Sequence, residues 1–131
     1  VMNIPTEQLI QSPSADPHSI WLQIRSEAQS AATDEPALAN FFNATVISHD
    51  SLGSALSYYL ASKLASKEVP QAMLRTVMDR AFSTTDIINA AAADIVATVD
   101  RDSACTLYLT PFLYFKGFLA LQAYRTVHQL W

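Results

Sequence analysis

The stretch TPFLYFKGFLALQAYRTVHQLW, residues 110–131, decides the fold of this chain. Thr110 and Pro111 are typical of a helix start, where proline lacks only an N–H that would have no partner. Polar residues then share one face at helical spacing: Gln122, Arg125, Thr126 and Gln129. The first half, PFLYFKGFLAL, is apolar on nearly every side, and its Gly117 favours close approach of another helix. The pattern therefore predicts a helix that is covered on all sides, by its own domain or by a partner chain.

A helix of this length could also cross a membrane. Its 22 residues would extend about 33 Å, enough to cross a bilayer. Polar and charged residues interrupt it: Lys116, Gln122, Arg125 and His128. Because each charge buried in lipid costs roughly 2.5–3.5 kcal/mol, we expect a helix packed in protein and no membrane partner.

The composition of the chain excludes several other classes of protein. Half of its 131 residues are hydrophobic and 15% are charged, which is typical of one folded domain and not of a disordered chain. The net charge is −4 and the eight Lys and Arg residues are scattered, so we expect no nucleic-acid partner. The single cysteine, Cys105, excludes an internal disulfide and a cysteine-based metal cluster. No other metal-ligand spacing and no Ser/His/Asp arrangement stands out in the sequence.

Glycine is the most informative residue count. Only Gly53 and Gly117 are present. Sheets with tight turns, phosphate-binding loops and dinucleotide folds need more glycine, at fixed spacings. Alanine is abundant, as in NAAAADIVA at residues 89–97, and favours helix. We therefore predict an all-α fold.

Five further helices precede the last one. Their predicted ranges are 16–32, 33–49, 49–66, 70–82 and 83–102. The residues predicted to cap or begin them are, in the same order, Asp16, Thr33 or Asp34, Asp50 or Ser51, Pro70, and Ser83, Thr84 or Thr85. Residues 1–15 are polar, contain two prolines and have no clear period. We expect them to form a flexible arm before a compact helical domain over residues 16–131.

Apolar residues at helical spacing give four of these helices an inward face. The first two faces are predicted to be Ile20, Trp21, Ile24 and Ala28, then Leu38, Phe41, Phe42 and Val46. The next two are Leu52, Leu56, Tyr59, Leu60 and Leu64, then Met73, Leu74, Val77 and Met78.

Five stretches carry a family resemblance. They are IWLQIRSEAQ (20–29), EPALANFF (35–42), HDSLGSALSYYLASKLAS (49–66), ADIVATVDRDSAC (93–105) and FLYFKGFLALQAYRTVHQLW (112–131). In this order and at this spacing they resemble the N-terminal helical domain of bacterial and plant serine acetyltransferases. The resemblance implies a compact all-α domain of six or more helices.

Members of that family continue into a left-handed parallel β-helix of glycine-containing hexapeptides. That domain holds acetyl-CoA and a histidine general base, and the acetyl group passes to the hydroxyl of L-serine. The product, O-acetylserine, serves cysteine biosynthesis, and cysteine inhibits from the serine site. No stretch of this chain resembles the hexapeptides. The resemblance therefore implies an excised N-terminal domain that has no catalytic residue, binds no cofactor and is inactive alone.

The resemblance also implies partners. Family enzymes are cytoplasmic hexamers, in which two trimers join through these helical domains, and their C-terminal tail docks into O-acetylserine sulfhydrylase. We therefore expect this chain to self-associate. The alternative is a stand-alone helical adaptor that only binds partners. A gene that continues past Trp131 into glycine-bearing hexapeptides would distinguish the two.

Asp102 is the one candidate substrate residue. The family pattern DIxAxxxRD ends on an aspartate that helps to hold serine, and here it covers residues 94–102. A carboxylate at that place can pair with the ammonium group of an amino acid. The alternative is that Asp102 only ends its helix or caps the next segment. The chain departs from the family at Ser103, where proline is usual, and Asp100 adds a further negative charge.

Two more residues of this motif are assigned to supporting the site loop. Asp94 lies among apolar neighbours, which favours a buried structural hydrogen bond over chemistry. Arg101 is predicted to anchor the loop after this helix by bonding carboxylates or helix-end carbonyls.

The remaining reactive side chains indicate structural roles. His49 with Asp50 is typical of capping at a helix start. His128, one turn after Tyr124, is typical of a packed or rim histidine. Cys105 is typical of a small, half-buried residue.

Overall fold

The described part of the chain is built from helices. The computed structural model describes residues 16–102, 104–114 and 116–130, and no strand occurs among them. The α-helices are α2 (Pro17–Asp34), α3 (Ala39–Phe42), α4 (Leu52–Leu64), α5 (Gln71–Phe82), α6 (Thr85–Arg101), α7 (Leu109–Tyr114) and α8 (Lys116–Leu130). The all-α prediction is confirmed. The predicted arm, residues 1–15, lies outside the described residues.

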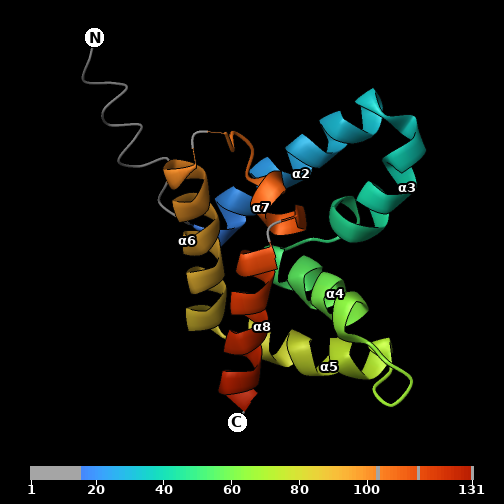
Figure 1. Cartoon of the computed structure of the whole chain (residues 1–131), viewed down its shortest axis with the longest axis vertical. Helices are drawn as coiled ribbons and strands as arrows, with labels where there is room; N and C mark the ends of the chain where they lie inside the picture. Colours follow the sequence, from blue (N-terminus) through green and yellow to red (C-terminus); the bar gives the residue numbers. More distant parts are fainter. Residues whose placement is uncertain (1–15, 103, 115, 131) are drawn as a thin grey trace.

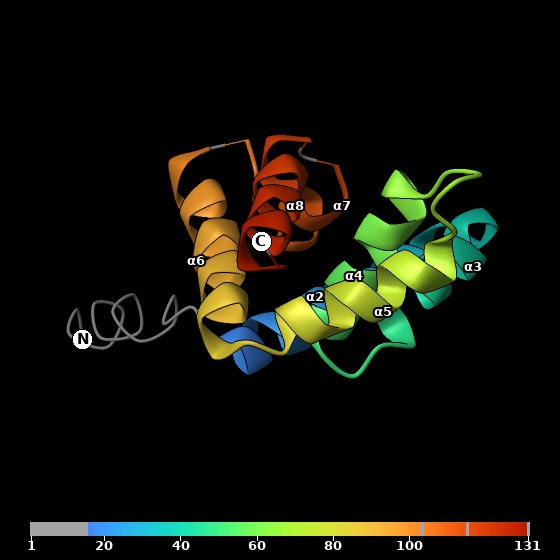
Figure 2. The same cartoon turned by 90° about the horizontal axis from the view of Figure 1, so that it is seen from below.

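The helices fall into two groups that contact each other and also share α2 as a neighbour. Helices α6 and α8 lie side by side, and α4 and α5 form a helical hairpin (Figure 1, Figure 2). Helix α2 contacts α3, α4, α6 and α7, so it is the element that both groups share. Helix α6 also contacts α4, α5 and α8, and α7 also contacts α6 and α8, so several helices together place the end of α6 and the start of α7.

The core centres on the ring of Phe112 in α7. Phe112 is fully buried, with Trp21 of α2 at 5.8 Å and Tyr59 of α4 at 5.6 Å between ring centroids. The Tyr59 hydroxyl donates a hydrogen bond of 2.6 Å to the backbone oxygen of Leu113. The Trp21 indole N–H donates to the backbone oxygen of His49 at 3.0 Å. Both aromatic polar groups are thus paired, as burial requires.

Local sequence signals locate most helix starts correctly. Asp16 caps α2, and its Oδ2 accepts hydrogen bonds from the Ser19 hydroxyl at 2.9 Å and the Ser19 N–H at 3.0 Å, which both lower the pKa of Asp16. Ser51 caps α4 by accepting the Ser54 N–H at 3.1 Å. Pro70 and Thr84 precede α5 and α6 as predicted. The prediction for the second helix is wrong, because α2 continues through Asp34 and Glu35 precedes the next turn.

The predicted second helix is broken into three short turns. A 3₁₀ turn (Pro36–Leu38) and α3 lead into a π turn (Asn43–Ile47). The Arg25 guanidinium of α2 donates to the Ile47 backbone oxygen at 2.7 and 3.1 Å, which satisfies a carbonyl at the end of the π turn. The inward face is confirmed only for Phe42 and Val46, because the turns rotate the remaining residues outward. Two residues of the predicted face are exposed: Leu38 (45%) and Phe41 (38%).

Two predicted inward residues lie at the end of the α4–α5 hairpin where the connecting loop joins the two helices. Leu64 ends α4 and is 49% exposed, and Met73 in the first turn of α5 is 56% exposed. This end points away from the other helices (Figure 1). The prediction is wrong for both residues: Leu64 lines an open hollow beside Leu119 of α8 and stays half-exposed, and Met73 is exposed to solvent.

The predicted last helix is two helices, α7 and α8. Thr110 and Pro111 lie inside α7, which begins at Leu109 and packs against α2. The polar face of α8 is directed inward, since Gln122 and Thr126 are buried. Its outward side carries exposed apolar residues: Leu121, Tyr124 and Val127. None of the described helices combines the length and the apolar character that crossing a bilayer needs.

The close approach predicted for Gly117 occurs at Gly53 instead. A Cβ added at Gly53 would lie 3.3 Å from the Phe82 backbone oxygen, whereas one at Gly117 would meet no atom within 4 Å. Gly53 therefore allows α4 to pack against the end of α5.

Candidate functional site: the end of α6

Asp102 lies at the C-terminal end of α6 with its side chain exposed to solvent. Its backbone N–H donates to the Thr98 oxygen at 3.1 Å, which ends the helix. One carboxylate oxygen, Oδ1, accepts the Ala104 N–H at 3.0 Å, and the backbone oxygen accepts the Cys105 N–H at 2.9 Å. These bonds fix the carboxylate in a turn. Within the described residues nothing bonds Oδ2, so this oxygen is open to a cationic ligand.

The surroundings of Asp102 favour a positive ligand. Asp100 is exposed two residues earlier, and the negative end of the α6 dipole adds to both carboxylates. Burial raises the pKa of the Cys105 thiol, and the charges of Asp102 and Glu27 raise it further. Burial also raises the pKa of Tyr108, with Asp100 and Glu27 as further causes. The negative charges of Glu27, Asp100 and Asp102 thus all lie near the segment that contains Cys105 and Tyr108.

The side chain of Asp94 connects α6 to α8. Its Oδ2 accepts a hydrogen bond of 2.8 Å from the Gln122 side-chain amide and forms an ion pair with Arg125. Arg125 also donates to Gln122 Oε1 at 3.3 Å, and the Thr126 hydroxyl donates to the Gln122 backbone oxygen at 2.8 Å. Gln122 is fully buried, so these bonds satisfy polar atoms that water does not reach. In the described residues, Asp94 contacts α8 and not the loop after α6.

The structure brings Asp94 and Arg101 to one hollow and leaves Asp102 outside it. The hollow, of about 330 Å³, lies between α6 and α8 and is lined by Asp94, Ala97, Thr98, Arg101, Gly117, Phe118 and Leu121. Arg101 is exposed at its rim. The three residues predicted from the motif therefore follow one another along the second half of α6 and its C-terminal cap but have different surroundings.

Glu27 is a residue of this region that sequence reasoning missed. Its Oε1 accepts the backbone N–H of Leu109, the first residue of α7, at 2.8 Å. Its Oε2 accepts the Gln23 side-chain N–H at 2.9 Å. Glu27 is the one acidic residue in the stretch 20–29, directly before the buried Ala28. A single acidic residue in this stretch is a signal that it has a specific partner. That partner, Leu109, lies 82 residues away and cannot be identified from the sequence.

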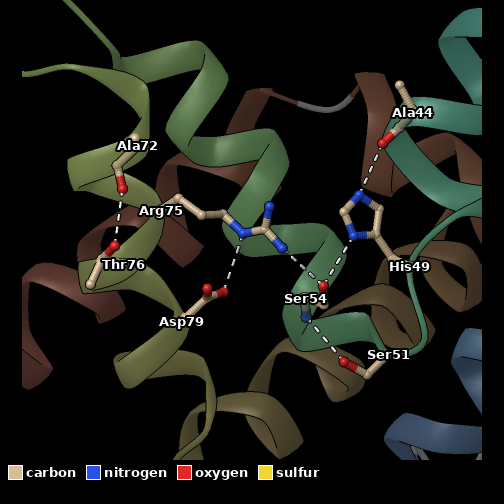
Figure 3. A network of polar contacts seen from close by, with 8 residues as sticks. All are labelled: Ala44, His49, Ser51, Ser54, Ala72, Arg75, Thr76 and Asp79. Carbon is tan, nitrogen blue, oxygen red and sulfur yellow. Dashed lines mark hydrogen bonds and ion pairs between the residues drawn. The ribbon is translucent and has the colours of Figure 1, made fainter.

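His49 precedes α4 and belongs to a polar network with residues of α4 and α5 (Figure 3). It is far from Asp102 in the sequence. The ring is buried, its Nε2–H donates to the Ala44 oxygen at 2.9 Å, and its Nδ1 accepts from the Ser54 hydroxyl at 3.0 Å. Arg75 donates to Ser54 Oγ at 3.1 Å and pairs with Asp79 at 3.3 Å. Burial lowers the pKa of His49. His49 therefore bridges turns, while the capping role belongs to Ser51.

The remaining reactive residues form no catalytic cluster within the described segments. His128 is exposed and stacks on Tyr124 at 5.7 Å between ring centroids, in the rim position that the sequence indicates. Cys105 is buried. No three His, Cys, Asp or Glu side chains of the described segments are grouped as a metal site would need.

The region around Asp102 falls inside a matched family. The family model described as "Serine acetyltransferase, N-terminal" matches residues 20–123. The chain belongs to this family. The serine acetyltransferase of Haemophilus influenzae is 49% identical over 113 residues, which are 86% of this chain and 42% of that protein.

Solved structures of serine acetyltransferases share the fold. A complex with CoA gives a TM-score of 0.85 at 47% identity, over 88% of this chain and 49% of that one. The enzyme of Neisseria gonorrhoeae in complex with serine gives 0.82 at 46% identity, over 85% of this chain and 46% of that one. The chain thus spans less than half the length of these relatives. It corresponds to the N-terminal domain of a serine acetyltransferase.

Proposed function

We propose that this chain supplies part of the serine site in an enzyme that transfers an acetyl group from acetyl-CoA to L-serine. The observation that carries the proposal is the exposed Asp102 carboxylate, held in a turn at the end of α6, with an Oδ2 that accepts no hydrogen bond from the part of the chain that the structure describes. Its position in the DIxAxxxRD pattern supports the same role. Asp102 binds the ammonium group of serine, by a charge-assisted hydrogen bond that fixes the amino acid at one end.

The chemical step belongs to parts of the enzyme beyond this chain. Fixing the ammonium leaves the serine hydroxyl free to point toward a thioester and a general base, both supplied by a β-helical domain. The contribution of Asp102 is thus orientation of a reactant, which lowers the entropic cost of the encounter. This domain alone is inactive, and acetyl-CoA is the co-substrate of the whole enzyme.

The second contribution of the domain is assembly. Exposed apolar side chains gather along α2 and the turns after it, where Leu22, Leu38 and Phe41 are 50%, 45% and 38% exposed. A small domain seldom leaves such residues to water unless another chain covers them. The chain self-associates through such faces, as part of a cytoplasmic hexamer. The O-acetylserine sulfhydrylase is a partner of the whole enzyme.

The experiment measures release of coenzyme A from acetyl-CoA with L-serine present. The full-length protein turns over, and residues 1–131 alone give only the uncatalysed rate. Sedimentation of the 131-residue chain at micromolar concentration gives an oligomer. Turnover by the chain alone, or a full-length protein inactive on serine, contradicts the proposed division of labour.

A further inference from the structure

The segment after Asp102 is tied at its far end to α2. Glu27 Oε1 accepts the Leu109 N–H at 2.8 Å, and that donor is one of the backbone groups left free at the start of a helix. Glu27 is half-buried between Ile24 and Ala28, both of which are fully buried. The carboxylate therefore projects from a helix that the core holds in place.

The carboxylate of Glu27 is itself oriented by a neighbour. Gln23, one turn earlier on α2, donates its side-chain N–H to Oε2 at 2.9 Å. Each oxygen of Glu27 thus has its own donor, one from its own helix and one from α7. Because both oxygens are paired, the Glu27 side chain is held in one orientation toward the Leu109 N–H.

A short series of bonds connects this contact to Asp102. The Thr110 N–H donates to the Leu107 oxygen at 3.3 Å, and the Cys105 thiol lies 3.6 Å from the same oxygen. Cys105 is buried, and its N–H donates to the Asp102 backbone oxygen at 2.9 Å. The anchored start of α7 is therefore only a short segment away from the candidate substrate carboxylate.

We propose that Glu27 is a positioning residue for serine, which acts through the Leu109 N–H to hold the Asp102 carboxylate in its binding geometry. The inference rests on the proposed function, because it gives Asp102 the serine ammonium as its ligand. Glu27 touches neither substrate nor reacting atoms. Its effect is on the place of Asp102, so it changes serine binding and leaves acetyl-CoA binding alone.

Three substitutions separate this role from a general effect of charge. Glu27→Gln keeps the length and an oxygen acceptor for Leu109, and Gln23 can turn its amide to accept from the new N–H. Glu27→Asp keeps the charge but is one methylene too short to reach Leu109. Glu27→Ala keeps neither. Asp34→Ala, which removes the other acidic residue of α2, is the matched control.

The experiment is steady-state kinetics of the full-length enzyme, with serine and acetyl-CoA each varied. We expect Glu27→Asp and Glu27→Ala to lower kcat/KM for serine about tenfold, with the KM for acetyl-CoA unchanged. Glu27→Gln and Asp34→Ala stay within about twofold. If the loss follows charge, so that the Gln variant is impaired and the Asp variant is normal, the positioning role is wrong. Equal losses for serine and acetyl-CoA also overturn it.

A double variant distinguishes failure of the inference from failure of the proposed function. If Glu27 acts through Asp102, then Glu27→Ala adds little to the loss caused by Asp102→Asn. A normal Asp102→Asn enzyme rejects the serine site itself. An impaired Asp102→Asn enzyme together with normal Glu27→Asp and Glu27→Ala enzymes rejects only the inference. Amide hydrogen exchange at Ala104 and Cys105, faster in Glu27→Asp than in Glu27→Gln, supports it if Glu27→Ala does not fold.

Discussion

Asp94 of α6 and Arg125 of α8 form an ion pair that is about one quarter exposed at each side chain. The same carboxylate accepts a bond from Gln122, which is fully buried, so the pair completes a polar seam inside the α6–α8 contact. Since α6 ends at Asp102, this seam fixes the helix that presents the candidate serine ligand. Asp94 thus ties the middle of α6 to α8, while Glu27 of α2 accepts a hydrogen bond from the start of α7.

Removing the charge partner of Asp94 should weaken the domain. Arg125→Met keeps much of the aliphatic stem but leaves Asp94 with Gln122 alone. We expect a loss of about 1 kcal/mol in the free energy of unfolding, more than for a surface pair and less than for a buried one. Urea denaturation measures it. Asp79→Asn, in the exposed pair with Arg75, is the control and should cost less than about 0.5 kcal/mol.

The Tyr59 hydroxyl should contribute measurably to stability. Tyr59→Phe keeps the stacking on Phe112 and removes the 2.6 Å bond to the Leu113 oxygen. We expect a loss of about 1 to 2 kcal/mol, since a buried carbonyl would lose its donor. Thermal or urea unfolding tests this. An unchanged stability would mean that water or another donor replaces the hydroxyl.

The two glycines should respond differently to alanine. Gly53→Ala would place a methyl group 3.3 Å from the Phe82 backbone oxygen, so crowding offsets the gain in helix propensity. Gly117→Ala has open space and should raise the free energy of unfolding by up to about 1 kcal/mol. Thermal melts of both variants provide the comparison. A Gly53→Ala protein more stable than Gly117→Ala would contradict the packing described between α4 and α5.

Stability should fall in weak acid because of His49. Its pKa in the folded state is lowered from 6.5, by burial first, with the nearby Arg75 adding to the effect, while the Ala44 hydrogen bond, Asp50 and Asp79 oppose it. The neutral ring is therefore favoured on folding. This contribution is complete above about pH 6.5 and is lost as the pH falls toward and through the lowered folded pKa. Unfolding curves between pH 5 and pH 8 should show a steeper acid loss for the natural chain than for His49→Gln. Parallel curves would mean that His49 does not carry the effect.

Local signals in the sequence predict much of the fold. Asp16 and Ser51 cap the helices that follow them because a cap depends on residues two or three positions away. Exposure depends on distant neighbours, which explains the errors at Phe41 and Leu64. A uniform helical period also hides the π turn at Asn43–Ile47, which Arg25 helps to stabilise from another helix.

The candidate site also has one part that the sequence predicts and another that it does not. The motif places Asp102 at a helix end, and the structure has it there. Its supports depend on pairings across the chain, between Asp94 and Arg125 and between Glu27 and Leu109. Separations of 31 and 82 residues leave no local pattern by which one sequence could indicate them.

The most direct measurement is the specificity constant for serine in the full-length Asp102→Asn enzyme. Asparagine keeps the size and can still accept the Ala104 N–H, so thermal melts should change by no more than an ordinary surface substitution, about 0.5 kcal/mol. Without the negative charge of Asp102, the bond to the serine ammonium group should lose roughly 1.5–3 kcal/mol, which lowers kcat/KM for serine by one to two decades. The KM for acetyl-CoA and the Asp100→Asn control should change little. Unchanged serine kinetics, or unfolding of the domain in place of a kinetic defect, would show that Asp102 only ends α6.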